Sequence, residues 1–542
     1  MKKSLILQVL AAAALLCGAE GCIKTDSTLG GSLIVVDDTY DIFSTSVPIT
    51  DIDLRMADSL SGYSSTRITV GAIRDEEFGL TTRASVITLV PLLDTMDFGT
   101  NPQFLNFHVS AAFDTVSVSS KDQLRILQNL YVYEPDAPLD IEKNFDINTD
   151  IPHGATKICA GSPVLNGADS LSFNLSAAYG SRYFTLTQAD LQDYKAYMQK
   201  FPGLYLCTDE PLADGGRINM FELQLNYDSD YKYIKGNYAR LSFRSEYDGH
   251  QKDSTFMFYL SATDFYDVDS LLTNSGFGSF PQYCLNLTGH STAAQQGKAG
   301  ARIAVEGGGG LKPCISAAAL KQMASDAIVA AGGDPSRTVI NKASLVFPFE
   351  YIPGMDYDKY PVMLSPTCRF RGSTTTAYMG LTDASSANEN QGDINYSLSQ
   401  YAPDITYHMQ EILKMSDSKI ASGNYDIWLL VMASETVTTT TAGSSEMSDY
   451  YKALAYSQYY NNMYSDYGGY GYGYGYGSYY GDPYSNYTSY MLAAQYAGMS
   501  STTSTKEMKL DKDRFYAAVL NGPTAPTGRV PRLELTFSVP RK

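Results

Sequence analysis

Short runs of apolar and β-branched residues, with a partly broken alternation of polar positions, recur along most of the chain. Runs of this length and composition predict β-strands. They outnumber the helical patterns throughout, so we expect a mainly β fold with two β-sandwich-like lobes and a few short helices. The clearest runs cover residues 68–73, 85–93, 105–112, 219–227, 238–245, 254–261, 339–349, 425–437 and 532–539.

Three segments instead carry apolar residues at helical spacing, and they cover residues 187–200, 316–331 and 404–414. Thr187 and Asp190 resemble a capping box at the start of the first segment. In the third segment His408 stands alone, which indicates a packing or surface histidine. We expect the third segment to be a short amphipathic helix that turns Ile405, Met409, Ile412 and Leu413 inward.

We place the boundary between the lobes near residues 240–250. This gives an N-terminal β-rich lobe over residues 37–245 and a C-terminal β-rich lobe over residues 246–542. Within the second lobe, residues 450–490 hold 16 of the 43 tyrosines of the chain. Glycine alternates with tyrosine at the centre of this segment, and glycine at every second position disfavours a helix and weakens a strand. We therefore expect a long Tyr/Gly-rich insertion at the tip of a sheet.

The centre of the insertion suggests a contact surface. Tyrosine supplies a large, stiff contact area, and glycine lets the chain adapt to its partner. Tyr470, Tyr472, Tyr474 and Tyr476 are therefore candidate partner-contact residues. Two alternatives stay open, namely that the tyrosines pack on the protein's own sheet or that the repeat is a neutral expansion.

The start of the chain carries a targeting signal. A positive start precedes an apolar stretch, residues 5–16, which is too short to span a bilayer. Small residues then lead to Cys22, as a lipoprotein signal peptidase requires. The sequence predicts a signal peptide over residues 1–21, lipidation at Cys22 and a flexible tether over residues 22–36. An ordinary secretory signal with a chance cysteine is the alternative.

Charge and cysteine content restrict the partners and cofactors. The 542 residues include 40 basic and 58 acidic side chains, a formal net charge of −18 at pH 7, so nucleic acid is not an expected partner. No cysteine pair beyond Cys22 has the C-x-x-C spacing of zinc or redox sites, and most of these cysteines are expected to be buried small hydrophobes. One disulfide is compatible with their number, and its pairing stays open. They are Cys159, Cys207, Cys284, Cys314 and Cys368.

Three short segments carry residue types that occur in ligand sites, and each has a plainer interpretation. Asp75, Glu76 and Glu77 are adjacent, so on a strand they would point to opposite faces, which favours a hairpin tip. Residues 146–150 alternate oxygen ligands as calcium sites do, but they lack the glycine and final glutamate of an EF-hand, which favours an Asx-type turn. Residues 307–310 are glycines without a following G-K-[ST], which favours a sharp turn over a phosphate loop.

No catalytic constellation stands out in the sequence. The motifs G-x-S-x-G and H-E-x-x-H and a Walker loop are absent, and the five histidines have no paired spacing. We therefore expect that the protein is not an enzyme and that it needs no metal or organic cofactor.

Six segments, in order along the mature chain, carry a resemblance to a known family. They are residues 22–30, 71–79, 201–206, 305–315, 340–345 and 407–409. In this order and spacing they resemble the outer-membrane lipoproteins of Bacteroidota that share a domain of unknown function. The Tyr/Gly-rich insertion is not part of that pattern. The resemblance implies a β-rich lipoprotein of the outer membrane that faces the cell exterior, and it carries no catalytic assignment.

These features favour a non-catalytic, lipid-anchored outer-membrane protein that acts by protein–protein contact in envelope assembly. An accessory subunit of an outer-membrane β-barrel complex is a related form of this hypothesis. The alternative is a glycan-binding lipoprotein of a nutrient-uptake system, because exposed tyrosines can stack on sugars. The expected partners are thus the outer membrane, an outer-membrane protein and, under the alternative, a glycan.

Overall fold

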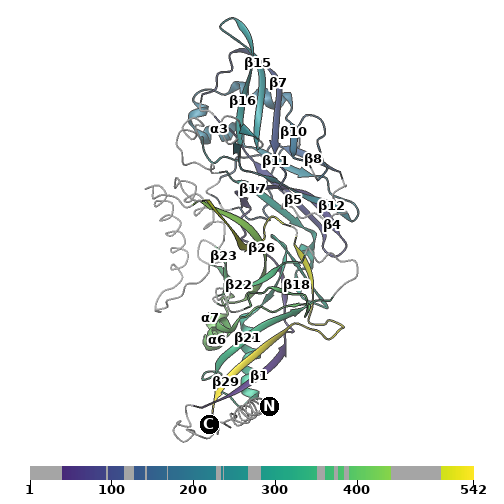
Figure 1. Ribbon diagram of the computed structural model, residues 1–542, viewed down its shortest axis with the longest axis vertical. Coiled ribbons are helices and arrows are strands. Elements are labelled where there is room, and N and C mark those ends of the chain that lie inside the picture. Colours follow the sequence, from purple (N-terminus) through teal and green to yellow (C-terminus); the bar gives the residue numbers. More distant parts are fainter. Residues whose placement is uncertain are drawn as a thin grey trace, which may run out of the picture.

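A computed structural model describes residues 39–541, apart from residues 93–94, 115–126, 141–142, 144, 168, 228–233, 236, 266–281, 351–359, 372–375, 382, 384–389, 441–501 and 515. The structure is mainly β, with 49% strand and 14% helix, which confirms the expected fold class. Figure 1 shows an elongated body with two lobes, one above the other. Cys22 and the tether lie outside the described residues, and so do Tyr470, Tyr472, Tyr474 and Tyr476.

The upper lobe of Figure 1 has two sheets around one apolar core. Alternation positions this core, since Phe107 and Val109 are buried while the residues between and beside them are more exposed. The first sheet has the order β10 (Leu171–Asn174), β7 (Thr100–Ala111), β15 (Tyr238–Tyr247), β16 (His250–Leu260) and β6 (Leu89–Pro91). The second has the order β12 (Gly215–Glu222), β4 (Arg67–Asp75), β5 (Gly79–Ile87), β11 (Leu204–Thr208), β8 (Gln128–Tyr133) and β9 (Val164–Leu165), with β17 (Cys284–His290) on β5 and β3 (Tyr63–Ser64) on β17. β13 (Asn226–Tyr227) and β14 (Ile234–Lys235) form a separate pair.

Short helical segments complete the upper core with aromatic side chains. The Tyr183 ring lies 3.8 Å from that of Phe201 and 5.1 Å from that of Phe107. The predicted capping box at the start of residues 187–200 is present, because Asp190 accepts hydrogen bonds from the amide and hydroxyl of Thr187 at 2.7 Å. The predicted single helix is nevertheless interrupted at Asp193, whose extended backbone caps a second helix. The segments are α2 (Ala177–Gly180), η3 (Ser181–Thr185), η4 (Asp190–Gln192) and α3 (Tyr194–Lys200).

The lower lobe is built from a five-stranded sheet, a seven-stranded sheet and a separate pair of strands. One sheet has the order β1 (Tyr40–Pro48), β29 (Arg532–Pro540), β21 (Val339–Pro348), β25 (Gln400–Tyr401) and β24 (Ile394–Asn395). The other has the order β18 (Gly297–Lys298), β2 (Asp53–Met56), β20 (Leu311–Ile315), β26 (Ile427–Thr440), β22 (Met363–Arg371) and β23 (Thr376–Gly380), with β27 (Thr502–Leu510) on β26. β19 (Arg302–Glu306) pairs with β28 (Ala517–Asn521), and the helical segments are η5 (Ser291–Gln295), α5 (Ala317–Ala330), α6 (Thr406–Lys414) and α7 (Asp417–Ile420).

The predicted helices of this lobe lie close to their expected bounds. Ser316 caps α5 by accepting a hydrogen bond from the Ala319 amide, as a serine before an apolar repeat predicts. The four residues expected to face inward are all buried, three of them on α6 and Ile405 at its N-cap. No helix of the described residues is long and apolar enough to cross a membrane.

The strand pairing divides the chain between the lobes differently from the predicted boundary at 245/246, which falls inside β15. β15 and β16 pair from Tyr238↔Tyr259 to Tyr247↔His250 and form one hairpin. Asp248 and Gly249 form its two-residue loop, and their positive φ angles of 51° and 78° fit a type I′ turn. β1 and β2 also leave the first lobe, because they pair with β29 and β20.

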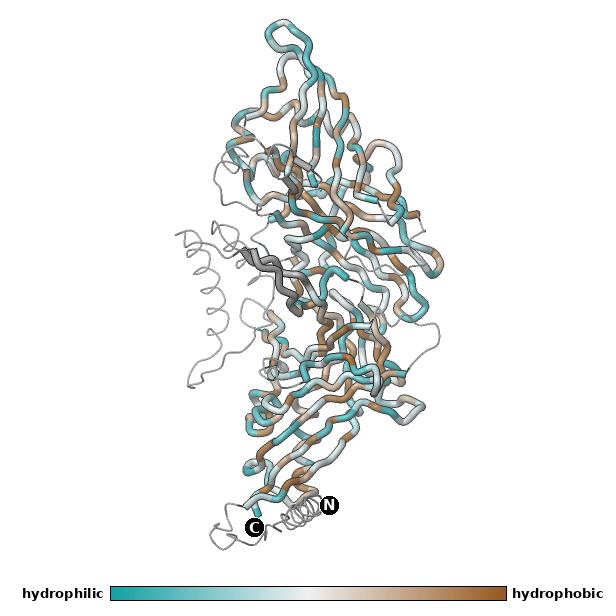
Figure 2. Tube along the Cα trace, in the orientation of Figure 1, coloured by the Kyte–Doolittle hydropathy of each residue, from teal (hydrophilic) through white to brown (hydrophobic). Residues whose placement is uncertain are grey.

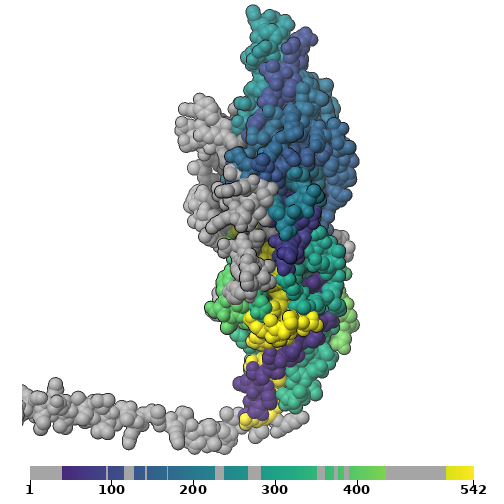
Figure 3. All heavy atoms as spheres, turned by 90° about the vertical axis from the view of Figure 1, so that its right-hand side faces the viewer, coloured from purple at the N-terminus to yellow at the C-terminus, as the bar shows by residue number. Residues whose placement is uncertain are grey.

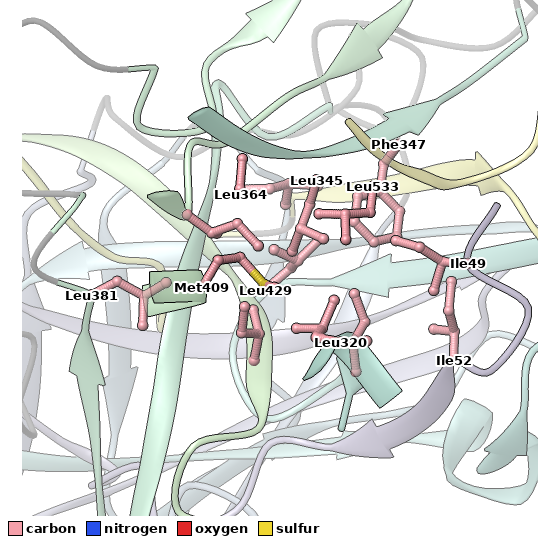
Figure 4. Close-up of a cluster of buried hydrophobic side chains, with 14 of the residues drawn as sticks. Ile49, Ile52, Leu320, Leu345, Phe347, Leu364, Leu381, Met409, Leu429 and Leu533 are labelled. Carbon is pink, nitrogen blue, oxygen red and sulfur yellow. The ribbon is translucent and has the colours of Figure 1, made fainter. Parts of the chain in front are cut away.

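The core of the lower lobe explains why β1 and β2 belong to this lobe. In Figure 4 the side chains of Ile49 and Ile52 point into the same cluster as Leu345 and Leu533. Ile49 and Ile52 are each 1% exposed, so their burial fixes the start of the described chain beside its last strand. Figure 2 shows hydrophobic colouring along the strands of both lobes and hydrophilic colouring at the β15–β16 tip.

Replacing Leu345 with alanine is expected to lower the free energy of unfolding by about 2–5 kcal/mol. Leu345 is fully buried in the lower core, so the substitution removes apolar contacts and leaves a cavity. Guanidinium denaturation measures the change. Val339→Ala is the matched control, because Val339 lies on the same strand and is 44% exposed. Equal losses in the two variants would contradict the assignment of Leu345 to the core.

Candidate functional site

The hairpin of β26 and β27 carries the segment that contains the candidate contact tyrosines. The two strands pair from Met432↔Leu510 to Thr440↔Thr502, so residues 441–501 connect the described ends of this hairpin. The first half of β26 lies between β20 and β22, where Trp428 and Leu430 are buried. One end of the hairpin therefore lies in the lower core. Figure 1 shows that β26 extends from there toward the side of the body.

The other strand of this hairpin ends in a buried charged segment. Residues 511–514, which we name the junction segment, read Asp-Lys-Asp-Arg and are between 2% and 7% exposed. The Asp511 amide donates to the Val431 carbonyl at 2.9 Å, and the Asp511 carbonyl accepts from the Gly308 amide at 2.9 Å. The segment is thus fixed to β26 on one side and to the loop between β19 and β20 on the other.

Arg83 of β5 joins the upper lobe to the junction segment. Its guanidinium donates to the Lys512 carbonyl at 2.7 Å and to the Arg514 carbonyl at 3.1 Å. It also donates to the hydroxyl of Thr288 on β17. Arg83 is 1% exposed, so these contacts replace water that the guanidinium lost on burial.

Two further side chains of the upper lobe hold the carboxylate of Asp513. Arg67 of β4 lies 3.4 Å from Asp513 and 2.8 Å from Asp114, and Asn286 of β17 donates to Asp513 at 3.3 Å. In the other direction, the Lys512 ammonium donates to the Ser61 carbonyl. The contacts therefore run from three strands of one lobe to a single four-residue segment of the other.

The glycine loop, residues 307–310, lies between two strands and does not lead directly into a helix. The ammonium of Lys312 donates to the carbonyls of Glu306, Gly308 and Gly310, the last two at 3.1 Å. A phosphate needs amide donors that converge on it, whereas here carbonyls converge on the Lys312 ammonium at the start of β20. The loop is thus a structural turn around Lys312, as the plainer interpretation expected.

Glu306 and His290 form a buried pair of titratable side chains beside this loop. His290 Nδ1 lies 3.2 Å from Glu306 Oε1, and both side chains are 2% exposed. Burial lowers the pKa of His290, although Glu306 raises it in part. Burial would raise the pKa of Glu306, but the contact with His290 and the hydrogen bonds from Thr292 and the Leu311 amide leave it lowered overall.

Burial shifts two pKa values toward 7, that of Asp511 in the junction segment and that of Lys312 beside it. It raises the pKa of Asp511 to about 7, against the opposing effect of Arg83. It lowers the pKa of Lys312 to about 7, against the opposing effects of Glu306 and Asp511. The two shifts have the same cause, namely that water no longer stabilises either charge.

The arrangement suits a structural role, namely the connection of the two lobes. The charged groups named above contact protein carbonyls, amides or opposite charges, and the loop glycines leave no room beside them. A Cβ at Gly307 would lie 2.1 Å from Asp511, and one at Gly309 would lie 2.0 Å from Asn148. We interpret the cluster as a rigid connection between the lobes. It lies where the β26–β27 hairpin, whose strands are connected by residues 441–501, joins the two lobes.

The remaining candidate segments have structural roles in the described chain. Asp75 accepts hydrogen bonds from the Glu77 and Phe78 amides at the β4–β5 turn, which confirms the hairpin tip. In residues 146–150 the Thr149 amide donates to the Asp146 carbonyl, a backbone turn, and Asn148 donates to the Ala57 and Gly309 carbonyls. Asn148 thus uses its amide group to join the lobes.

His408 is a packing histidine, one of the two roles that the sequence left open. It is 5% exposed and its Nε2 lies 3.0 Å from the Tyr425 carbonyl. Burial lowers its pKa to about 4. The described residues contain no group of three His, Cys, Asp or Glu side chains placed to hold a metal ion. The five cysteines are all free thiols, buried except for the half-buried Cys207.

The junction was not recognisable from the sequence. An Asp-Lys-Asp-Arg run after a strand is typical of a solvated turn, and Arg83 lies in an ordinary alternating strand. No family model matches this chain, and no curated protein or solved structure matches it either.

Proposed function

We propose that this protein is a non-catalytic lipoprotein of the outer membrane that faces the cell exterior and acts by protein–protein contact in envelope assembly. The Tyr/Gly-rich insertion, residues 450–490, supplies the contact, and an outer-membrane β-barrel complex is the proposed partner. The observation that carries the proposal is the anchoring of this segment. Its flanking strands pair over nine positions and end in the lower core and in the junction segment. Contact loops are effective when a rigid scaffold positions them.

Deleting residues 466–482 tests this proposal. Folding and membrane location should survive, because shortening a loop changes its closure entropy by little. Co-purification of the partner after crosslinking in native membranes should be lost. A length-matched variant in which Tyr470, Tyr472, Tyr474 and Tyr476 become serine should lose it as well. If both variants retain the partner at the level of the unmodified protein, the insertion is not the contact.

The anchor is tested by replacing Cys22 with alanine. The variant should move from the membrane fraction to the soluble fraction, because the acyl chains that hold the body at the bilayer are absent. Mass spectrometry of the unmodified protein should find an acylated Cys22 at the mature N-terminus. Cys17→Ala should stay in the membrane fraction. An unacylated N-terminus beyond residue 22 would refute the lipoprotein assignment.

The glycan-binding alternative requires aromatic rings with free faces. On the outer side of β8 and β11 the half-buried rings of Tyr133, His153 and Tyr205 stack on one another at 4.6 and 4.4 Å. These contacts engage both faces of the His153 ring and one face each of the Tyr133 and Tyr205 rings, so this group by itself does not favour the alternative. Affinity electrophoresis in polysaccharide gels distinguishes the two functions, since retardation would support glycan binding.

A further inference from the structure

The first strand of the described chain has one open edge. β1 pairs with β29, where the Thr39 carbonyl accepts from the Arg541 amide and the Ile49 amide donates to the Pro531 carbonyl. Backbone groups alternate in direction along an antiparallel strand. The odd-numbered residues of β1 therefore bond to β29, and the even-numbered residues turn their amides and carbonyls outward. No strand of the described chain pairs with β1 on that side.

This edge has few of the features that usually prevent strands from associating. Natural edge strands carry lysine, inward charges, proline or bulges. The open part of β16 follows this rule, with exposed Lys252 and Asp253. β1 has one charged residue, Asp41, and its carboxylate lies 2.8 Å from Arg541 Nε. Its proline, Pro48, stands at the last position.

The open edge is also exposed and apolar at one end. Ile42 is 70% exposed and Tyr40 is 50% exposed. Figure 3 shows β1 as a purple strip on the surface of the lower lobe, beside yellow β29. Beyond Ile42 the same face consists of small hydroxyl residues, with Ser44 3.1 Å from Thr536. A second backbone could approach such a face without a bulky or charged obstacle.

We propose that two copies of this chain associate through β1, antiparallel about a two-fold axis, and form one continuous sheet. A second copy fits because the same edge is open on each and because one register is self-complementary. In that register Phe43 faces Phe43 of the second copy, Ile42 faces Ser44, and Tyr40 faces Ser46. The facing pairs of even-numbered residues exchange backbone hydrogen bonds. This association goes beyond the proposed partner contact and does not depend on it.

Packing and charge agree with this register. Phe43 stacks on Phe537 with ring centroids 5.7 Å apart, so a Phe43 pair would extend an existing aromatic row across the axis. Asp41 would face Thr45, so no like charges oppose each other. Elsewhere on this face Glu534 is paired with Arg532 at 2.8 Å. The overall charge of −18 thus has little local repulsion to add at this edge.

Sedimentation of the purified mature chain over a range of concentrations tests the proposal. The unmodified chain should form a dimer, and Ile42→Lys should weaken association at least tenfold. It removes an apolar side chain from the interface and places two ammonium groups at diagonal positions across the axis. Val339→Lys is the matched control. Ile42 and Val339 flank Ser538 on the same exposed face, but Val339 lies two strands from the edge, so its variant should dimerise normally.

A disulfide tests the register. Phe43 would lie on the two-fold axis, at a position where facing Cα atoms approach closely enough for a disulfide. Phe43→Cys should therefore form an intermolecular disulfide under oxidation. A chain that is monomeric at every concentration overturns the proposal, and so does a dimer that Ile42→Lys leaves intact. In the first case another segment or another protein covers β1, and in the second the copies meet through another face.

Discussion

Replacing Arg83 with methionine is expected to lower the free energy of unfolding by about 3–5 kcal/mol, the range for removing one member of a buried charge network. The guanidinium donates to two carbonyls of the junction segment and to Thr288, and it is 1% exposed. Methionine fills much of the same volume without donating hydrogen bonds. The Lys512 and Arg514 carbonyls would then be buried without this donor, and nearby acidic groups would lose a compensating charge.

The shape of the unfolding transition should change as well. The two lobes have separate main apolar cores, and the junction segment supplies charged contacts between them. A smaller apolar contact, of Phe78 with Ala517 and Val519, also connects the lobes. With Arg83 removed, we expect calorimetry to resolve two transitions where the unmodified chain has one. Arg244→Met is the control, since Arg244 lies in an exposed pair with Asp253 and should have little effect. A single, unshifted transition in the Arg83 variant would show that the junction does not couple the lobes.

Local sequence patterns predicted many of the longer strands but missed β1, β22 and β27. Alternation of apolar residues predicts β29. The Asp248-Gly249 turn of the β15–β16 hairpin was not predicted, although Asp-Gly is a typical hairpin turn. The predicted domain boundary nevertheless cut this hairpin, because composition changes little between strands that belong to different cores. Which strands pair over long distances, such as β1 with β29, depends on burial that a local pattern does not encode.

The burial of the charged junction segment could not be predicted from the sequence. A charged residue in a sequence is normally exposed, and the run at residues 511–514 follows no apolar pattern. Its burial becomes possible only when carbonyls and opposite charges from distant segments meet it, as Arg83 and Arg67 do. Residues separated by more than 400 positions cannot be paired from spacing alone. The sequence therefore predicts an insertion but not the buried charged segment beside the strands that flank it.

Asp511 of the junction segment makes the free energy of unfolding depend on pH, and the burial of its carboxyl group determines the sign. Its pKa is about 7 in the folded chain against an ordinary value of 3.8, because burial disfavours the carboxylate. Between these values the unfolded chain has released the proton and the folded chain retains it. The contribution of Asp511 is therefore fully present below about pH 4 and is lost as the pH rises to about 7.

Asp511→Asn should remove this dependence, since asparagine does not titrate and keeps an oxygen to accept from the Arg514 amide. The unfolding free energy of the variant minus that of the unmodified chain should rise between about pH 4 and pH 7. The rise is on the order of a few kcal/mol, at about 1.4 kcal/mol per pKa unit. Taking the difference cancels the shared groups that do not interact with Asp511, such as His290 and Glu306. Lys312 does not cancel, because Asp511 raises its pKa in part.

Denaturant unfolding in buffers from pH 4 to pH 7.5 measures this difference. Asp326→Asn on the exposed face of α5 is the control, and it should change the free energy of unfolding little. Lys312 acts in the opposite sense above pH 7, because its folded pKa of about 7 lies below the ordinary 10.5 and stability returns as the unfolded chain loses its proton. The junction should therefore contribute least near pH 7. A difference for Asp511→Asn that stays flat from pH 4 to pH 7 would show that Asp511 is ionised in the folded chain throughout.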